Sequence, residues 1–369
     1  MRRLLGSLRR GLARTARGPR DRARHRAIAA AAPVRGRVAV SYGHDRIPTL
    51  DEPAHGGTVK FQQLQRELPN EPRAFNVLYL GSSNRPHDSS ELVRLAHARG
   101  APVVLNQNGV AYPGWHGPGW ERTNEPLAEL LGAADHVFFQ SAFCKRSADR
   151  FLGEPNGAWE ILHNPIDTER FVPRPRGERQ LTLLLGGNQY QRYRFESAVR
   201  ALALVAAERE ARLLVGGRLS WHPDARQAER EAAELLADAD VADRVELVGA
   251  FTQREAPALY ARADLLVHTK YNDPCPTVVL EAMASGLPIV YSASGGTPEL
   301  VGDAGVGLPA PEDFERDHPP DPEPLAQAIL DAADRREELG AAARARAERR
   351  FALPGWIERH RELFAELVA

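Results

Sequence analysis

Short apolar runs and segments of helical period alternate along the chain from Gly36 onward. RVAVSYG (37–43), FNVLYLG (75–81) and ARLLVGG (211–217) are mostly apolar and end at glycine, which is typical of buried strands. SSELVRLAHARG (89–100) has apolar residues three and four positions apart and stops at a glycine, which indicates a helix. The pattern therefore predicts an α/β fold made of repeated strand, loop and helix units.

This architecture occurs twice, on either side of the polar, proline-bearing segment PRPRGERQ (173–180). The chain has 369 residues, which is enough for two domains, and such a segment is typical of an interdomain linker. We therefore expect a first domain over residues 34–175 and a second over residues 176–350. The last segment, 351–369, is predicted to be a helix with an apolar stripe.

The most informative stretch runs from Tyr271 to Gly302 and follows the buried strand ADLLVH (263–268). Helical spacing predicts a helix over Thr277–Ser285, and Pro276 fits its start because the missing N–H of proline costs nothing there. The amides of Thr277 and Val278 are then free at the helix N-terminus. Such free amides form an anion site.

Two carboxylates flank this helix start. Asp273 lies in the loop before the helix, and Glu281 lies on the helix eight positions later. Both can face the crevice at the carboxyl ends of the strands, where ligands bind in open α/β sheets. Taken alone, a helix cap and an ordinary surface residue would be the better explanation of the pair.

Residues 1–33 form a basic segment in which Leu4, Leu5, Leu8 and Leu12 have helical spacing among arginines. Two interpretations stay open for it. An amphipathic helix of this kind can lie on an anionic membrane surface, at the inner face of the membrane. The alternative is a disordered arginine-rich tail.

Overall composition excludes other classes of partner and site. A net charge of −1 does not suit binding to nucleic acid. Two cysteines, Cys144 and Cys275, are too few for a disulfide framework, which indicates a reducing, cytoplasmic location. The Asp238 and Asp240 pair resembles a metal-binding motif but closes a polar helix, so we do not expect it to hold a metal. Lysine occurs only at three positions, so phosphate contacts from side chains should fall mainly to arginine.

The stretch from Asp273 to Val301 resembles the signature of glycosyltransferase family 4, the group 1 glycosyl transferases. That signature is Glu, seven residues and Glu, followed by Ala-Met-Ala-x-Gly-x-Pro and a Gly-Gly-x-Pro-Glu loop. Asp273 stands in place of the first Glu, which indicates a subgroup, and Glu281 is the second. The resemblance extends to ILHNPIDTERFVP (161–173) and implies the GT-B fold. In that fold two doubly wound, Rossmann-like domains face each other across a cleft, and the last helix crosses back to the first domain.

By this resemblance Glu281 would bind the donor ribose, the amides of Thr277 and Val278 the diphosphate, and Asp273 the sugar hydroxyls, as a catalytic residue. The Arg and Lys of the family that hold the diphosphate are replaced by Asn188 and Tyr193. We transfer their role to two neighbouring arginines, although a solvated basic helix start is an equal alternative. The predicted donor site is completed by Asn188, Arg192, Arg194, Gly187, Cys275, Gly295 and Gly296.

On the acceptor side the resemblance points to Gly56 and Gly57, which could equally form an ordinary turn. Asn108 stands where the family has a catalytic histidine, so it can hydrogen-bond a hydroxyl but cannot carry a proton. The following loop contains aromatic rings that could stack on sugars and a histidine that could act as a base; alternatively, they pin the loop to the domain. These residues are Tyr112, Trp115, His116 and Trp120.

Together these features predict a retaining glycosyltransferase that moves a sugar from a nucleotide-sugar donor to a hydroxyl of a glycan, lipid-linked or small-molecule acceptor. The work of the family suggests cell-envelope glycan or glycolipid biosynthesis, and the resemblance implies that neither a metal nor another cofactor is needed. Two alternatives stay open. One is a nucleotide-sugar epimerase of the same fold, which Asn108 disfavours because an epimerase needs acid and base groups. The other is a sugar-nucleotide-binding protein without catalysis.

Overall fold

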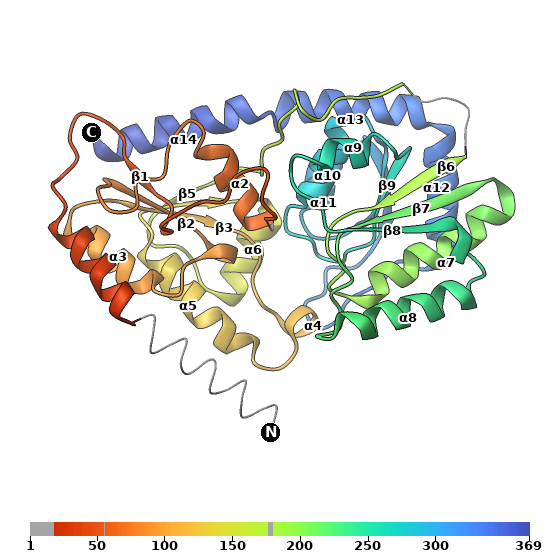
Figure 1. Ribbon diagram of the computed structural model, residues 1–369, viewed down its shortest axis with the longest axis horizontal. Helices are drawn as coiled ribbons and strands as arrows, with labels where there is room; N and C mark the ends of the chain where they lie inside the picture. Colours follow the sequence, from red (N-terminus) through yellow and green to blue (C-terminus); the bar gives the residue numbers. More distant parts are fainter. Residues whose placement is uncertain (1–17, 55, 176–179) are drawn as a thin grey trace.

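The computed structural model describes residues 18–54, 56–175 and 180–369. Two α/β domains lie side by side, and each is built on a parallel sheet (Figure 1). The first sheet has the order β1-β2-β3-β4-β5. Its strands are β1 (Val40–Ser41), β2 (Val77–Gly81), β3 (Val103–Gln107), β4 (His136–Phe139) and β5 (Ala158–Ile161). The predicted α/β fold class is confirmed.

The second sheet has the order β11-β10-β9-β6-β7-β8, so the direction of winding reverses between β6 and β9. Its strands are β6 (Leu181–Leu185), β7 (Ala211–Gly216), β8 (Val245–Gly249), β9 (Leu265–His268), β10 (Ile289–Ala293) and β11 (Gly305–Pro309). Loops that leave neighbouring strands in opposite directions open a crevice at such a reversal, beyond the carboxyl ends of the strands. The loops after β6 and β9 therefore meet at the natural place for a ligand.

Helices cover both faces of each sheet. In the first domain they are α2 (Gly56–Leu64), η1 (Ser82–Asn84), α3 (Ser89–Ala98), α4 (Pro113–His116), α5 (Trp120–Ala133) and α6 (Ala142–Phe151). In the second they are α7 (Arg192–Glu208), α8 (Ala225–Asp238), η2 (Ala242–Arg244), α9 (Ala256–Tyr260), α10 (Thr277–Ala284), α11 (Thr297–Val301), α12 (Pro322–Asp334) and α13 (Arg336–Arg350).

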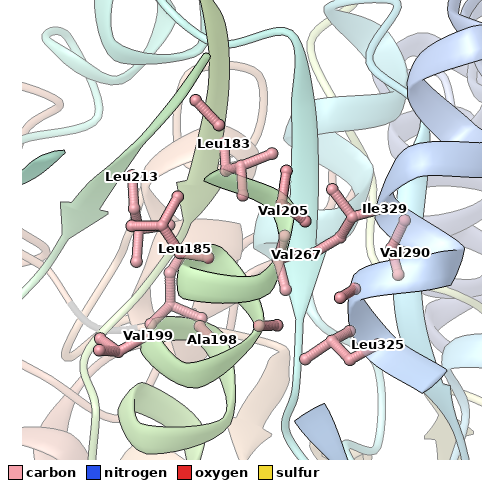
Figure 2. Packing of buried hydrophobic residues seen from close by; sticks show 14 of the residues in the cluster. Leu183, Leu185, Ala198, Val199, Val205, Leu213, Val267, Val290, Leu325 and Ile329 are labelled. Carbon is pink, nitrogen blue, oxygen red and sulfur yellow. The ribbon is translucent and has the colours of Figure 1, made fainter. Parts of the chain in front are cut away.

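Alternation along β6 shows why its run of leucines is a strand covered on both faces. Leu183 and Leu185 point to one face and pack with α7 and α12, where Val199 and Ile329 meet them (Figure 2). Leu184, between them in sequence, joins the core on the opposite face beneath α10. Successive side chains of a strand point to opposite faces, so a continuous apolar run fits a sheet buried on both sides.

The last helix, α14 (Leu353–Val368), crosses from the second domain to the first (Figure 1). Its Trp356, Ile357 and Phe364 pack with β2 and α2 in one core cluster of the first domain. His360 is buried among them and shares a hydrogen bond of 3.0 Å with the Tyr79 hydroxyl. The two domains are therefore joined by a packed helix as well as by the chain at residues 174–180.

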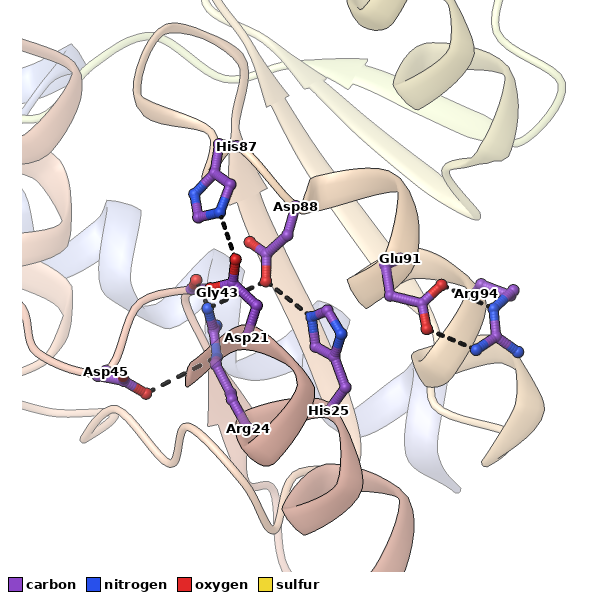
Figure 3. Close-up of polar contacts among 9 residues, drawn as sticks. All are labelled: Asp21, Arg24, His25, Gly43, Asp45, His87, Asp88, Glu91 and Arg94. Carbon is purple, nitrogen blue, oxygen red and sulfur yellow. Dashed lines mark hydrogen bonds and ion pairs between the residues drawn. The ribbon is translucent and has the colours of Figure 1, made fainter. Parts of the chain in front are cut away.

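Residues 18–30 are helical and pack against the first domain (Figure 3). Ile28 is buried in the core under α3, while Arg24 and His25 pair with Asp88 at 3.4 and 2.8 Å. The prediction of a separate segment over residues 1–33 is corrected for this part, because a buried isoleucine and ion pairs tie it to the fold. The leucines of the predicted amphipathic helix lie outside the described residues. Within the described part of the chain, no helix is both long and apolar enough to cross a membrane.

Candidate functional site

A pocket lies between the two domains and is lined from both sides. The first domain contributes the start of α2, the second contributes the start of α10, and the segment after β5 closes one side. Its lining includes Gly56, Lys60, Gln63, Asn164, Thr277 and Glu281. The structure thus brings the predicted Gly56 to the same pocket as Thr277 and Glu281.

The start of α10 offers free amides to this pocket. Pro276 precedes the helix with an extended backbone, and its carbonyl accepts the amide of Val279 at 3.1 Å. Among the described residues the amides of Thr277 and Val278 have no hydrogen-bond partner. A Cβ placed on Gly56 would lie 3.9 Å from the Thr277 hydroxyl, so the start of α2 faces the start of α10. Two helix N-termini therefore converge, which favours an anion between them.

Glu281 lies one turn into α10 and is buried at the edge of the pocket. The hydroxyl of Tyr260 donates to it at 2.6 Å and the amide of Gln253 at 3.0 Å. Burial raises the pKa of Glu281, and these two hydrogen bonds and nearby Arg170 only partly oppose that effect. Two donors hold the carboxylate in place while its remaining lone pairs stay available to a ligand hydroxyl.

The raised pKa predicts that Glu281→Gln melts at a higher temperature than the wild type at pH 8. The native state binds the proton of Glu281 more tightly than the unfolded chain does, so ionisation costs stability as pH rises above the unfolded pKa. Glutamine removes this cost. The difference in melting temperature between the variant and the wild type should therefore shrink as pH falls towards 5. Thermal unfolding over this pH range is the measurement, with exposed Glu337→Gln as the control; a variant that melts lower at pH 8 contradicts the prediction.

Asp273 lies in the loop between β9 and α10, beside the side chains of His268 and Lys270, each 3.3 Å away. Burial opposes ionisation, but Lys270, His268 and Arg194 together lower the pKa of Asp273 below its usual range. Burial also lowers the pKa of His268, so that imidazole is neutral at pH 7. Asp273 is therefore a carboxylate throughout the physiological range and cannot serve as a proton donor.

Gly295 and Gly296 pack tightly on this loop. A Cβ on Gly296 would collide with the carbonyl of Pro274, and Gly295 has a φ of +66°. The amide of Gly296 donates to the Asp273 carbonyl at 2.8 Å. In the structure the two glycines hold the Asp273 loop, and any contact of theirs with the donor stays a prediction.

The two arginines predicted to bind phosphate do not line the pocket. Arg194 is buried and donates to the carbonyls of Asn188 and Gly186 at 2.7 and 3.4 Å, so it braces the loop after β6. The side chain of Asn188 accepts the amide of Arg218 at 2.8 Å, and Gly187 has a φ of +82° in the same loop. Arg192 is exposed at the start of α7. Neither arginine lines the pocket, and their predicted contact with the diphosphate stays a prediction.

Asn108 accepts a hydrogen bond from Lys60, a residue that the sequence did not identify as part of the site. Lys60 is buried in α2, lines the pocket, and donates to the side-chain oxygens of Asn106 and Asn108, the latter at 3.3 Å. The amide of Asn108 donates to Ser83 at 2.8 Å. Burial lowers the pKa of Lys60 to about 7. The available signal was a lysine one turn after the predicted Gly56-Gly57 start, in a chain with few lysines.

Two residues of the loop region after β3, Tyr112 and Trp120, have a structural role. Tyr112 is buried against Phe151 and Phe314, with ring centroids 6.0 and 5.1 Å apart, so its ring has no free face for a sugar. The prediction for Tyr112 is therefore corrected. Trp120 also packs on Phe151, at 5.3 Å. Trp115 and His116 are exposed, but neither lines the pocket.

Phe314 belongs to the segment between β11 and α12 and inserts into the first domain. Only 4% of its surface is exposed, and it stacks on Phe143 at 5.8 Å. Its carbonyl accepts the amide of Gly114 at 2.8 Å. Nearby, Glu299 of α11 accepts the amides of Ala142 and Phe143, at 2.8 and 2.9 Å, at the N-terminus of α6. These contacts join the domains close to the Asp273 loop.

Cys275 is buried next to Asn164, whose side-chain amide donates to the Cys275 carbonyl at 3.0 Å. Burial raises the pKa of its thiol, which is therefore protonated and unreactive. Within residues 18–54, 56–175 and 180–369, no group of three or more histidine, cysteine or acidic side chains is arranged to hold a metal ion. The predicted independence from metal stays a prediction.

Residues 180–335 match the family model described as glycosyl transferases group 1. This part of the chain is therefore similar to the group 1 glycosyl transferases. It contains the Asp273 loop, α10 and Glu281 and excludes α2 and Asn108. The family resemblance drawn from Asp273–Val301 is confirmed for this domain, while the subgroup with Asp in the first acidic position stays a prediction.

Curated relatives extend the similarity beyond this domain. D-inositol 3-phosphate glycosyltransferase of Mycobacteroides abscessus is 28% identical over 271 residues, 67% of this chain and 58% of that protein. GDP-mannose-dependent alpha-(1-6)-phosphatidylinositol monomannoside mannosyltransferase of Mycobacterium tuberculosis is 28% identical over 221 residues, 52% of this chain and 54% of that protein. The chain thus spans little more than half the length of these relatives.

Solved structures share the arrangement of both domains. Sucrose-phosphate synthase from Thermosynechococcus elongatus superposes with a TM-score of 0.64 at 19% identity, covering 83% of this chain and 76% of that one. Anabaena Alr3699/HepE, in complex with UDP-glucose, also gives 0.64, at 16% identity and with coverage of 84% and 82%. At such identities the likeness shows the fold. The two domains therefore have the predicted GT-B arrangement.

Proposed function

We propose that the protein is a glycosyltransferase that moves a sugar from a nucleotide-sugar donor to a hydroxyl group of an acceptor. The observation that carries the proposal is the pocket between the domains, where the starts of α2 and α10 converge beside buried Glu281. A diphosphate needs N–H groups or positive charge, and a ribose needs an acceptor for its hydroxyls. Both are present within one pocket.

In this proposal the amides of Thr277 and Val278 hold the diphosphate, and Glu281 binds the ribose. Tyr260 and Gln253 fix the Glu281 carboxylate before the donor arrives, which lowers the entropy cost of binding. The complex of Anabaena Alr3699/HepE with UDP-glucose supports a nucleotide sugar as the donor.

For the reaction we propose transfer with retention of anomeric configuration, as the family resemblance implies. Asp273 would contact the sugar hydroxyls as a permanent carboxylate, since its neighbours keep it ionised. Asn108 would orient a hydroxyl without taking its proton. The name of the Mycobacterium tuberculosis relative, a phosphatidylinositol monomannoside mannosyltransferase, supports a glycolipid acceptor in the cell envelope. The name of the Mycobacteroides abscessus relative, which gives inositol 3-phosphate, supports a small-molecule acceptor instead.

A thermal-shift screen of the purified protein against UDP-, GDP-, ADP- and dTDP-sugars tests the donor. A ligand that binds only the native state at about 100 times its Kd stabilises by about 2.7 kcal/mol, which raises the melting temperature by several degrees. We expect one donor to give this shift and Glu281→Ala to abolish it, whereas exposed Glu337→Ala keeps it. No shift with any donor would overturn the proposal. With the donor known, NMR of the product reports whether configuration is retained.

A further inference from the structure

The diphosphate of a nucleotide-sugar donor leaves with negative charge, and the second domain offers little side-chain charge to meet it. Arg194 is occupied with the carbonyls of Asn188 and Gly186. Arg192 is exposed and does not line the pocket. Lys270 pairs with Asp273 at 3.3 Å. Of the residues that line the pocket, Lys60 of the first domain is the one lysine or arginine.

The position of Lys60 in the pocket and its incomplete set of hydrogen bonds suit the binding of an anion. Its two hydrogen bonds go to the neutral amide oxygens of Asn106 and Asn108. An ammonium group has three N–H donors, so one remains for a ligand in the pocket. No carboxylate within the described ranges forms an ion pair with Lys60. A buried charge without a counter-ion is costly, and an arriving diphosphate would supply one.

The groups around Lys60 carry little negative charge of their own. Cys275 of the Asp273 loop and Cys144 of α6 are protonated thiols, because burial raises the pKa of each. His360 of α14 is neutral, since burial lowers its pKa to about 3. The acidic groups that share the pocket are Glu281, whose pKa burial raises, and Asp167. The hydroxyl of Tyr79 of β2 is also neutral, because burial raises its pKa.

We propose that Lys60 binds the diphosphate of the donor across the domain boundary, and that donor binding brings a proton to Lys60. The inference rests on the proposed function and adds a residue from the first domain to the donor site. Without a ligand the amine is only partly protonated near neutral pH, because burial lowers its pKa to about 7. A phosphate beside it favours the charged form, so the proton is taken up on binding. Above pH 7 the affinity should fall about tenfold per pH unit.

Titration calorimetry of the full chain tests this with UDP, GDP, ADP and dTDP, each at pH 8 in two buffers of different ionisation enthalpy. The difference between the buffers gives the number of protons taken up. We expect close to one proton at pH 8 for the nucleotide that binds. At pH 6 this uptake should disappear, because Lys60 already carries its proton and the terminal phosphate, with a pKa of about 6, releases its own on binding. The matching nucleoside lacks phosphate, so its binding should take up no proton.

Three variants test whether Lys60 is the group that takes up the proton on binding. Lys60→Met should weaken diphosphate binding by about 10- to 100-fold, the range for one charge-assisted hydrogen bond. Lys60→Arg should bind without proton uptake, because arginine stays charged at every pH tested. Lys145→Met, a matched change on α6 away from the pocket, should behave as the wild type.

The outcomes separate this inference from the proposed function. Failure of every nucleoside diphosphate to bind the wild type overturns both. Binding without proton uptake by the wild type, or with uptake that persists in Lys60→Arg, overturns the role of Lys60 alone. The wild-type titration decides the matter even if Lys60→Met does not fold.

Discussion

Phe314→Ala is expected to lower the free energy of unfolding by about 3–5 kcal/mol, the range for truncating a buried phenylalanine. The ring is 4% exposed and fills a site in the first domain, although its chain segment belongs to the second. Phe143, Phe151 and Tyr112 surround it, and Arg150 lies 5.0 Å from its centroid. Alanine leaves a cavity that these large rings cannot easily close.

The same substitution should also separate the unfolding of the two domains. Differential scanning calorimetry of the variant should show two resolved unfolding transitions, because one of the contacts that join the domains is lost. In the wild type the two transitions should lie closer together in temperature. Phe195→Ala is the matched control, since Phe195 is equally buried but lies wholly within the second domain. A Phe314→Ala protein that loses less than about 1 kcal/mol would contradict the packing described here.

Asp273→Asn is expected to reduce the rate of sugar transfer by about 100-fold or more, the usual effect of removing one charged or hydrogen-bonding group from the reacting centre. The substitution keeps the shape and removes only the charge that Lys270 and His268 hold in place. Binding of the free nucleotide should change little, since Glu281 and the amides of α10 are untouched. Steady-state kinetics with the donor from the screen, together with nucleotide titration, measure both effects.

The stability of this variant provides an internal check. The pKa of Asp273 is lowered in the native state, so its carboxylate stabilises the fold above its unfolded pKa of about 4 and loses this effect as pH falls. Asp273→Asn should therefore melt below the wild type at pH 7, and the difference should shrink as pH falls below 4. Asp273→Glu keeps the charge and should retain more activity than asparagine does. Full activity in Asp273→Asn would exclude a catalytic carboxylate.

The local sequence pattern was sufficient to predict the helices, the strands and part of the candidate site. The start of α10 could be predicted because Pro276 and the apolar positions after it act on their own neighbours, and Glu281 follows at a fixed helical offset. The buried strands could be predicted because an apolar run such as Leu181–Leu185 has few other stable arrangements. Gly295 and Gly296, between β10 and α11, were recognised in sequence, although their close packing on the Asp273 loop was visible only in space.

Tertiary structure decided the remaining features, because each depends on which distant elements pack together. Lys60 becomes a buried amine in the pocket only when α2 lies over β3 and against α14. Tyr112 is buried because Phe314, about two hundred positions later in the chain, fills the space beside it. Arg194 turns towards the carbonyls of its own loop instead of the pocket. The sequence by itself thus determined the elements, the two domains and the anion-binding helix start, whereas burial and the pairing of charges, which depend on non-local contacts, were decided by the fold.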